Sequence, residues 1–157
     1  MYLMREVKVM KRLSLLSLAL LLSCSPSANA SDSGENAQES TSFLDYSEVT
    51  TQIKWVDIFE QEEERYLIYF YSEYCGYCRD IKEEFLTYYF GADEKIYFVD
   101  SIKEKAVYKS GAEWIIGVNN IDDFFIPGTP FLVEISNWNV TNYYIGVSAI
   151  RLYIQNE

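Results

Sequence analysis

Residues 66–78, YLIYFYSEYCGYC, decide the fold of this chain. An apolar and aromatic run of six residues comes first and predicts a buried strand, and the segment that follows has helical periodicity. Cys75 and Cys78 therefore lie where a strand meets the start of a helix. The free N–H groups of a helix N-terminus favour the thiolate of the first cysteine, which is the nucleophilic form of sulfur. We expect a dithiol that cycles to a disulfide.

The cysteine and histidine content of the chain limits the roles that this cysteine pair can have. The chain has three cysteines and no histidine, and its first cysteine, Cys24, lies in the N-terminal targeting segment, outside the expected domain. A structural zinc site usually takes four Cys or His ligands, so we expect no metal and no cofactor. A purely structural disulfide over so short a ring would contribute only about 2 kcal/mol on the chain-entropy model. A redox role is therefore the favoured interpretation.

Residues 1–23 predict a cleaved signal peptide, because four basic residues precede a ten-residue apolar run that is too short to span a bilayer. Two cleavage sites are open. Residues 21–24, LLSC, resemble a bacterial lipoprotein signal, in which cleavage precedes Cys24 and this cysteine is the lipid attachment site. Cleavage at Ala30 would instead give a secreted or periplasmic protein. Both alternatives predict an extracytoplasmic domain, and the first anchors it to a membrane.

Two segments are expected after the leader. Residues 24–42 are rich in Ser, Asn, Asp and Glu without apolar periodicity, which predicts a flexible tether. Residues 43–157 have the length of one small domain.

Without the four basic residues and one glutamate of the leader, the chain carries nine basic and 23 acidic residues, a net charge of −14. This charge argues against nucleic-acid binding and against binding of the domain itself to anionic lipid.

Periodicity in the domain predicts alternating helices and strands. The predicted elements are, in order, a helix on the spacing of Val49, Ile53, Val56 and Phe59, a strand at 66–71, a helix from the cysteines to about Gly91, a strand at 96–99, partly helical structure within 101–120, a strand at 131–135, a turn at 137–139, a strand at 140–145 and a short helix at 149–155. The last two strands should pair antiparallel across their turn. This order predicts an α/β domain with a mixed sheet flanked by helices on both faces.

Three features resemble the thioredoxin superfamily. Residues 70–78 look like the segment that leads from a strand into its active site. Residues 126–133, IPGTPFLV, are similar to the loop that holds the family's cis-proline, and Gly146 stands where the family often has a glycine. The resemblance covers roughly residues 43–157 and implies the thioredoxin fold.

The resemblance also implies thiol–disulfide exchange at the two cysteines of the domain. Cys75 would be the nucleophile that attacks a substrate disulfide. Cys78 would then resolve the mixed disulfide and release the reduced substrate.

A substrate-binding surface around the dithiol follows from the same resemblance. Pro130 would follow a cis peptide bond, and the Thr129 backbone would pair with an extended substrate segment. Gly76 and Tyr77, between the cysteines, would tune the dithiol, and Tyr74 would lie on the rim.

Two departures from the family pattern concern the dithiol. Tyr69 stands where thioredoxins carry a buried acid that helps to deprotonate the second cysteine, and Glu73 and Asp100 are the candidates to take over this task. The dipeptide between the cysteines is Gly-Tyr, which resembles the bacterial periplasmic disulfide isomerase rather than thioredoxin.

We expect a monomeric, exported thiol–disulfide oxidoreductase. Its partners would be disulfides or dithiols of exported proteins, together with a membrane redox partner that recharges it. Reduction of substrate disulfides, in support of redox homeostasis outside the cytoplasm, is the first interpretation. The alternatives are a disulfide-donating oxidase or isomerase, and a non-catalytic accessory protein of a peptide-export system.

Overall fold

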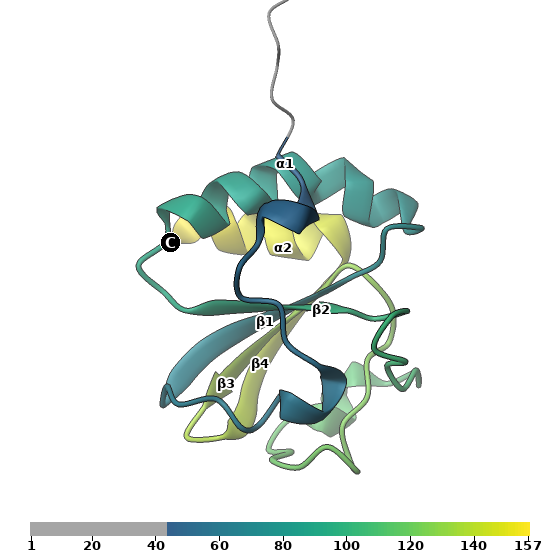
Figure 1. Ribbon diagram of the computed structural model, residues 1–157. Coiled ribbons are helices and arrows are strands. Elements are labelled where there is room, and N and C mark those ends of the chain that lie inside the picture. The colour runs from purple at the N-terminus through teal and green to yellow at the C-terminus, as the bar shows by residue number, and fades with distance from the viewer. Residues whose placement is uncertain (1–43) are drawn as a thin grey trace, which may run out of the picture. The chain divides into compact units, whose positions relative to one another are not determined.

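Strand β1 (Arg65–Tyr71) lies inside the sheet, as its continuous apolar run predicts. All its residues after Arg65 are buried, because layers of side chains cover both faces of the strand. β1 pairs in parallel with β2 (Ile96–Asp100) and antiparallel with β3 (Phe131–Ser136). Figure 1 shows these strands beneath the two helices.

The fourth strand, β4 (Asn139–Ile145), pairs antiparallel with β3 and completes a sheet of order β2-β1-β3-β4. Asn137 and Trp138 make the turn between β3 and β4 with φ values of 49° and 58°, as in the tight turns that suit hairpins. A strand–helix–strand unit followed by an antiparallel hairpin and a helix, in this strand order, is the thioredoxin fold. The predicted α/β class and mixed sheet are therefore confirmed.

The computed structural model describes residues 44–157. The predicted signal peptide, most of the tether and Cys24 lie outside the described residues. Within them, none of the helices has the length and apolar character that a membrane crossing requires.

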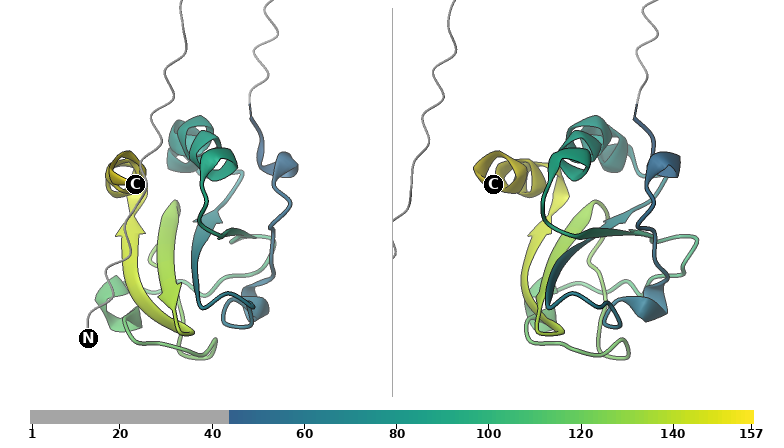
Figure 2. Two further views of the ribbon diagram at one scale, coloured as in Figure 1. Left: turned by 90° about the vertical axis from the view of Figure 1, so that its left-hand side faces the viewer. Right: turned by 60° about the vertical axis from the view of Figure 1, so that its left-hand side comes forward.

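One face of the sheet is covered by the helices α1 (Gly76–Gly91) and α2 (Gly146–Asn156), which lie side by side in both views of Figure 2. Ile81, Phe85 and Leu86 of α1 are fully buried against this face. Ile81 and Phe85 are four residues apart and therefore lie on the same side of the helix.

The other face is covered by 3-10 turns and loops. Helix η2 (Trp55–Asp57) and helix η3 (Ala112–Ile115) contribute Trp55 and Ile115 to the core of this face, together with residues 124–126. Only η3 forms within the segment 101–120 that the sequence predicts to be partly helical. Both faces thus have helical cover, but the α-helices lie on one of them.

The prediction of a helix on the spacing of Val49 to Phe59 is wrong. The chain forms η1 (Tyr46–Glu48) just before this segment and η2 within it, with extended backbone between them. Phe98 of β2 donates its N–H to the Thr51 carbonyl at 3.0 Å, and Ile53 donates to the Phe98 carbonyl at 2.9 Å. β-Branched residues have reduced rotamer freedom in a helix, and the open edge of β2 offers hydrogen bonds to this segment instead.

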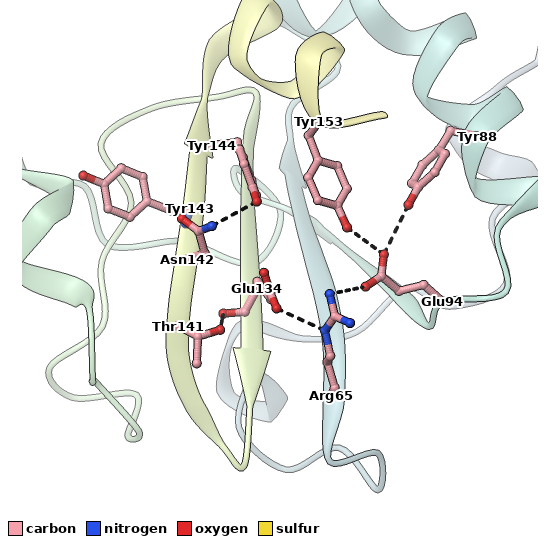
Figure 3. A network of polar contacts seen from close by, with 9 residues as sticks. All are labelled: Arg65, Tyr88, Glu94, Glu134, Thr141, Asn142, Tyr143, Tyr144 and Tyr153. Carbon is pink, nitrogen blue, oxygen red and sulfur yellow. Dashed lines mark hydrogen bonds and ion pairs between the residues drawn. The ribbon is translucent and has the colours of Figure 1, made fainter. Parts of the chain in front are cut away.

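A polar cluster ties the helices to the sheet at the start of β1. The Glu94 carboxylate accepts hydrogen bonds from Tyr153 at 2.8 Å and Tyr88 at 3.2 Å, and lies 3.4 Å from the Arg65 guanidinium. Arg65 also pairs with Glu134 of β3 at 3.0 Å. Figure 3 shows Glu94 between the tyrosines of α1 and α2, so this one carboxylate links both helices to β1.

Replacement of Phe85 tests the packing between α1 and the sheet. Its ring is fully buried and stacks on Tyr69 with centroids 3.9 Å apart. We expect Phe85→Ala to lower the free energy of unfolding by about 3–5 kcal/mol, measured by denaturant titration of the reduced protein. The control is Phe90→Ala on the same helix, where the ring is 52% exposed and the expected loss is below about 1 kcal/mol. Equal losses in the two variants would contradict this packing.

Candidate active site at the start of α1

A short turn after β1 places Cys75 at the N-cap of α1. Ser72 is buried, and it accepts the Cys75 N–H on its carbonyl at 3.1 Å and the Tyr74 N–H on its hydroxyl at 3.2 Å. The Cys75 sulfur in turn accepts the N–H of Cys78 at 3.1 Å. A helix N-terminus leaves such N–H groups without helical partners, so the sulfur serves here as the cap.

The two thiols are free and differ in burial. Cys75 is half-buried, whereas Cys78 is fully buried beneath it. Burial, together with the hydrogen bond to the Cys75 side chain, raises the pKa of Cys78 to about 12. Cys78 is therefore a thiol at neutral pH, and Cys75 is the sulfur that a substrate can reach first.

The loop before β3 meets the dithiol. The Thr129–Pro130 peptide bond is cis, and the Cys75 thiol donates a hydrogen bond to the Thr129 carbonyl at 3.2 Å. The Gly146 N–H, at the start of α2, donates to the Pro130 carbonyl at 3.0 Å. The structure thus brings together the two cysteines, this loop and the β4–α2 junction, which are far apart in the sequence.

Two tyrosines flank Cys75 in the sequence and project into solvent. Tyr74 is 86% exposed and Tyr77 is 70% exposed, while Gly76 between the cysteines is also exposed. Tyr rings combine a large apolar surface with a hydroxyl that can form hydrogen bonds, which suits them to transient contacts with polypeptides. Of the residues predicted to line the substrate surface, Tyr74, Gly76 and Tyr77 are thus accessible, whereas Thr129 is half-buried and Pro130 is buried.

Tyr69 takes part in a chain of hydroxyl groups behind the dithiol. Its hydroxyl lies 3.2 Å from the hydroxyl of Tyr46, which donates to the Cys78 carbonyl at 3.2 Å. Because Tyr46 has a single hydroxyl proton, Tyr69 must be the donor in the bond between them. Burial raises the pKa of both phenols, so both are neutral at physiological pH and cannot act as a base.

Sequence reasoning missed Tyr46. It belongs to η1, it is 32 residues from Cys78, and its local sequence carries no signal of this contact. Only the fold brings η1 beside the first turn of α1.

The two acids considered as helpers of Cys78 lie elsewhere. Glu73 is exposed, and the Asp100 carboxylate accepts the N–H groups of Ile102 at 3.1 Å and Lys103 at 3.2 Å, where it closes the turn after β2. No hydrogen bond joins either acid to Cys78 in residues 44–157. The surroundings of the buried thiol are therefore neutral.

The two thiols can form a disulfide with each other, which releases two electrons without any metal ion. Among the described residues, no group of three or more His, Cys, Asp or Glu side chains is arranged to hold a metal ion.

Comparisons with known proteins find similar solved structures at low sequence identity. No protein-family model matches the chain, and no curated protein sequence matches it. A variant of the thioredoxin from Halobacterium salinarum is 15% identical, with a TM-score of 0.47 over 67% of this chain and 84% of that one. Thioredoxin f2 from Chlamydomonas reinhardtii is 17% identical, with a TM-score of 0.46 over 66% and 90%. Mitochondrial thioredoxin 3 from Saccharomyces cerevisiae is 13% identical, with a TM-score of 0.47 over 68% and 94%.

These likenesses concern the fold alone, and the strand order β2-β1-β3-β4 of the chain itself defines its fold. The chain has the thioredoxin fold, with a Cys-x-x-Cys pair at the junction between β1 and α1.

Alkylation distinguishes the two thiols of the site. We expect iodoacetamide at neutral pH to label Cys75 of the native reduced protein at least about tenfold faster than Cys78, because only Cys75 is accessible and the buried sulfur stays protonated. Tandem mass spectrometry locates the label. Unfolding in urea should remove the difference, and equal labelling of both in the native protein would contradict the assigned burial.

Alkaline pH should destabilise the reduced domain. The native pKa of Cys78, at about 12, lies above the value near 8.5 of an exposed thiol, and the pKa values of Tyr66 and Tyr71, also about 12, lie above the usual value near 10. The unfolded chain therefore loses these protons first. The free energy of unfolding should be fully retained below about pH 8 and fall as the pH rises toward 12.

Urea titrations between pH 7 and 11 measure this fall. Cys78→Ala is the control, because it should remove the part of the decline that begins near pH 8.5 and keep the part caused by the tyrosines. A free energy of unfolding that stays constant to pH 11 would contradict the burial of these groups.

Proposed function

We propose that this chain is a thiol–disulfide oxidoreductase that works outside the cytoplasm on disulfides of exported proteins. The observation that carries the proposal is the pairing of a half-exposed Cys75 at a helix N-terminus with a fully buried Cys78. Thiol–disulfide exchange needs this asymmetry, since one sulfur must meet the substrate and the other must be kept for the second step.

Reduction of a substrate takes two steps at this site. The Cys75 thiolate attacks one sulfur of the substrate disulfide, a Cys75–substrate bond forms, and the other substrate sulfur leaves as a thiolate that takes up a proton. Cys78 then loses its proton and attacks the Cys75 sulfur. The Cys75–Cys78 disulfide forms and the second substrate thiolate leaves, so the substrate gains two electrons that the dithiol has lost.

The second step is the slow one in this proposal. The attack requires the thiolate of Cys78, whose thiol has a raised pKa, and the groups behind it are the neutral phenols of Tyr46 and Tyr69. The described residues place no carboxylate at Cys78 to accept its proton. The mixed disulfide should therefore persist longer than it would beside a buried acid.

The surroundings of Cys75 support a polypeptide as the substrate. The Thr129 backbone lies within hydrogen-bond reach of the reactive sulfur, and Tyr74 and Tyr77 offer exposed rings beside it. An extended segment paired with Thr129 would hold its disulfide against Cys75.

The leader sequence supports a location outside the cytoplasm. A basic start, a short apolar run and Cys24 are the pattern of a lipoprotein signal, which would hold the domain at a membrane. A protein there needs a membrane electron donor to regenerate its dithiol after each reduction. The domain itself would act as a monomer.

Cysteine variants test the exchange reaction. Cys78→Ser should accumulate a mixed disulfide with a disulfide-bonded peptide, visible as a mass increase that dithiothreitol reverses, because the resolving sulfur is absent. Cys75→Ser should form no adduct through Cys78 and lose turnover by at least about a thousandfold. Unchanged turnover in Cys75→Ser would contradict the enzymatic proposal.

The reduction potential of the pair decides the direction of the reaction. Equilibration with dithiothreitol or glutathione would give about −270 mV for a reductant and about −120 mV for a disulfide donor. A pair that fails to equilibrate would favour an accessory protein that binds a partner without using its dithiol.

A further inference from the structure

The segment that follows β2 differs in charge from the rest of the domain. The described residues hold nine basic and 20 acidic side chains. Residues 101–109, SIKEKAVYK, hold three of the nine basic residues and a single acid, Glu104. We call the lysines of this segment, Lys103, Lys105 and Lys109, the lysine flank.

The charges of the lysine flank are available to a partner. All three side chains are exposed, and none forms an ion pair within residues 44–157, where Arg65, Lys82, Lys95 and Arg151 do so. The neighbouring acid Asp100 is engaged with backbone N–H groups, and Glu104 is half-buried. Asp100 and Glu104 offset two of the three lysine charges, so residues 100–109 keep one net positive charge in a domain that is otherwise strongly acidic.

The segment begins beside the end of β1, the strand that leads to the dithiol. Ser101 donates both its N–H and its hydroxyl to the Tyr71 carbonyl at 2.8 Å, four residues before Cys75. Because β1 and β2 are parallel, the segments that follow them leave the sheet at the same edge, on the right in Figure 1.

The segment ends beside the loop that meets Cys75. Ile126 donates its N–H to the Val107 carbonyl at 2.9 Å, and Lys109 donates to the Ile126 carbonyl at 3.1 Å. Ile126 leads directly into residues 127–130, whose Thr129 carbonyl accepts the Cys75 thiol. Both ends of the segment are thus fastened to the two parts of the chain that form the site.

Apolar side chains lie between the lysines. Ile102 is 55% exposed, Tyr108 45% and Val107 42%. A mixture of apolar surface and unpaired charge suits a polypeptide better than a small anion, since both kinds of group need a partner. On the α1 side of the dithiol the exposed charges are Glu73, Arg79 and Asp80, which sum to a negative charge. The site therefore has one basic flank.

We propose that the lysine flank selects disulfide-bonded polypeptides with acidic residues beside their reactive cysteine. This inference rests on the proposed oxidoreductase function and names its class of substrate. Exposed charges act over about 10 Å at roughly 0.1 M ionic strength and are screened further by added salt, so the selection should appear mainly in the rate of association.

Disulfide-linked fluorogenic peptides test the selection, with dithiothreitol as the electron donor. Two peptide series carry Asp or Lys on the N-terminal side, or on the C-terminal side, of the cysteine. We expect kcat/KM for the acidic peptide to exceed that for the basic one by about fivefold to tenfold in at least one series at low salt. The ratio should approach one near 0.5 M salt.

Two variants of equal net charge separate the lysine flank from the charge of the whole protein. Lys103→Gln/Lys109→Gln removes two positive charges beside the site, and we expect it to reduce the preference at least threefold. Lys95→Glu changes the net charge by the same amount at the start of β2, the opposite end of the sheet from the dithiol, and should keep the preference. A loss of the same size in both variants would overturn the proposal.

Three further outcomes are distinguishable. Equal kcat/KM for acidic and basic peptides in both series would overturn the selection and leave the oxidoreductase function intact. No reduction of any peptide would overturn both. Binding to vesicles of anionic phospholipid that the double variant abolishes, without a peptide preference, would assign the lysine flank to a lipid surface and overturn the proposal.

Discussion

The burial of β1 on both faces is the constraint on which the rest of the structure depends. Alternate residues of the strand supply two separate cores, one under α1 and α2 and the other under the 3-10 turns. A strand held on both faces and by two neighbouring strands has little freedom to shift. The turn that follows it can therefore present Cys75 at a fixed point, with Cys78 beneath it, because the position of α1 is set by the same core.

The site combines this fixed geometry with neutral surroundings. Around the buried sulfur lie carbonyl groups, aromatic rings and two phenols, and the charged groups remain at the surface. Burial without a nearby charge favours the protonated form of a thiol. The two sulfurs therefore differ in burial although only two residues separate them in the sequence, and the difference comes from the fold rather than from the motif.

Much of the fold follows from local sequence patterns. The apolar run before the cysteines, the periodicity of α1 and the alternation on either side of Trp138 each act over a few residues, and the corresponding elements form as predicted. The prediction of a helix around Val49 is wrong because the apolar spacing there fits a helix, while the hydrogen bonds of the segment come from Phe98, almost 50 residues later. The contact of Tyr46 with Cys78 cannot be predicted from the local sequence for the same reason, because it forms only when η1 packs against α1.

The contacts of η1 also join the first described residues to the helix that carries the dithiol. Asp45 pairs with Lys82 of α1 at 3.0 Å, and Tyr46 bonds to the Cys78 carbonyl. The first described residues are therefore attached to the first turns of α1. A force applied at the first described residues would therefore act on the helix that carries the dithiol.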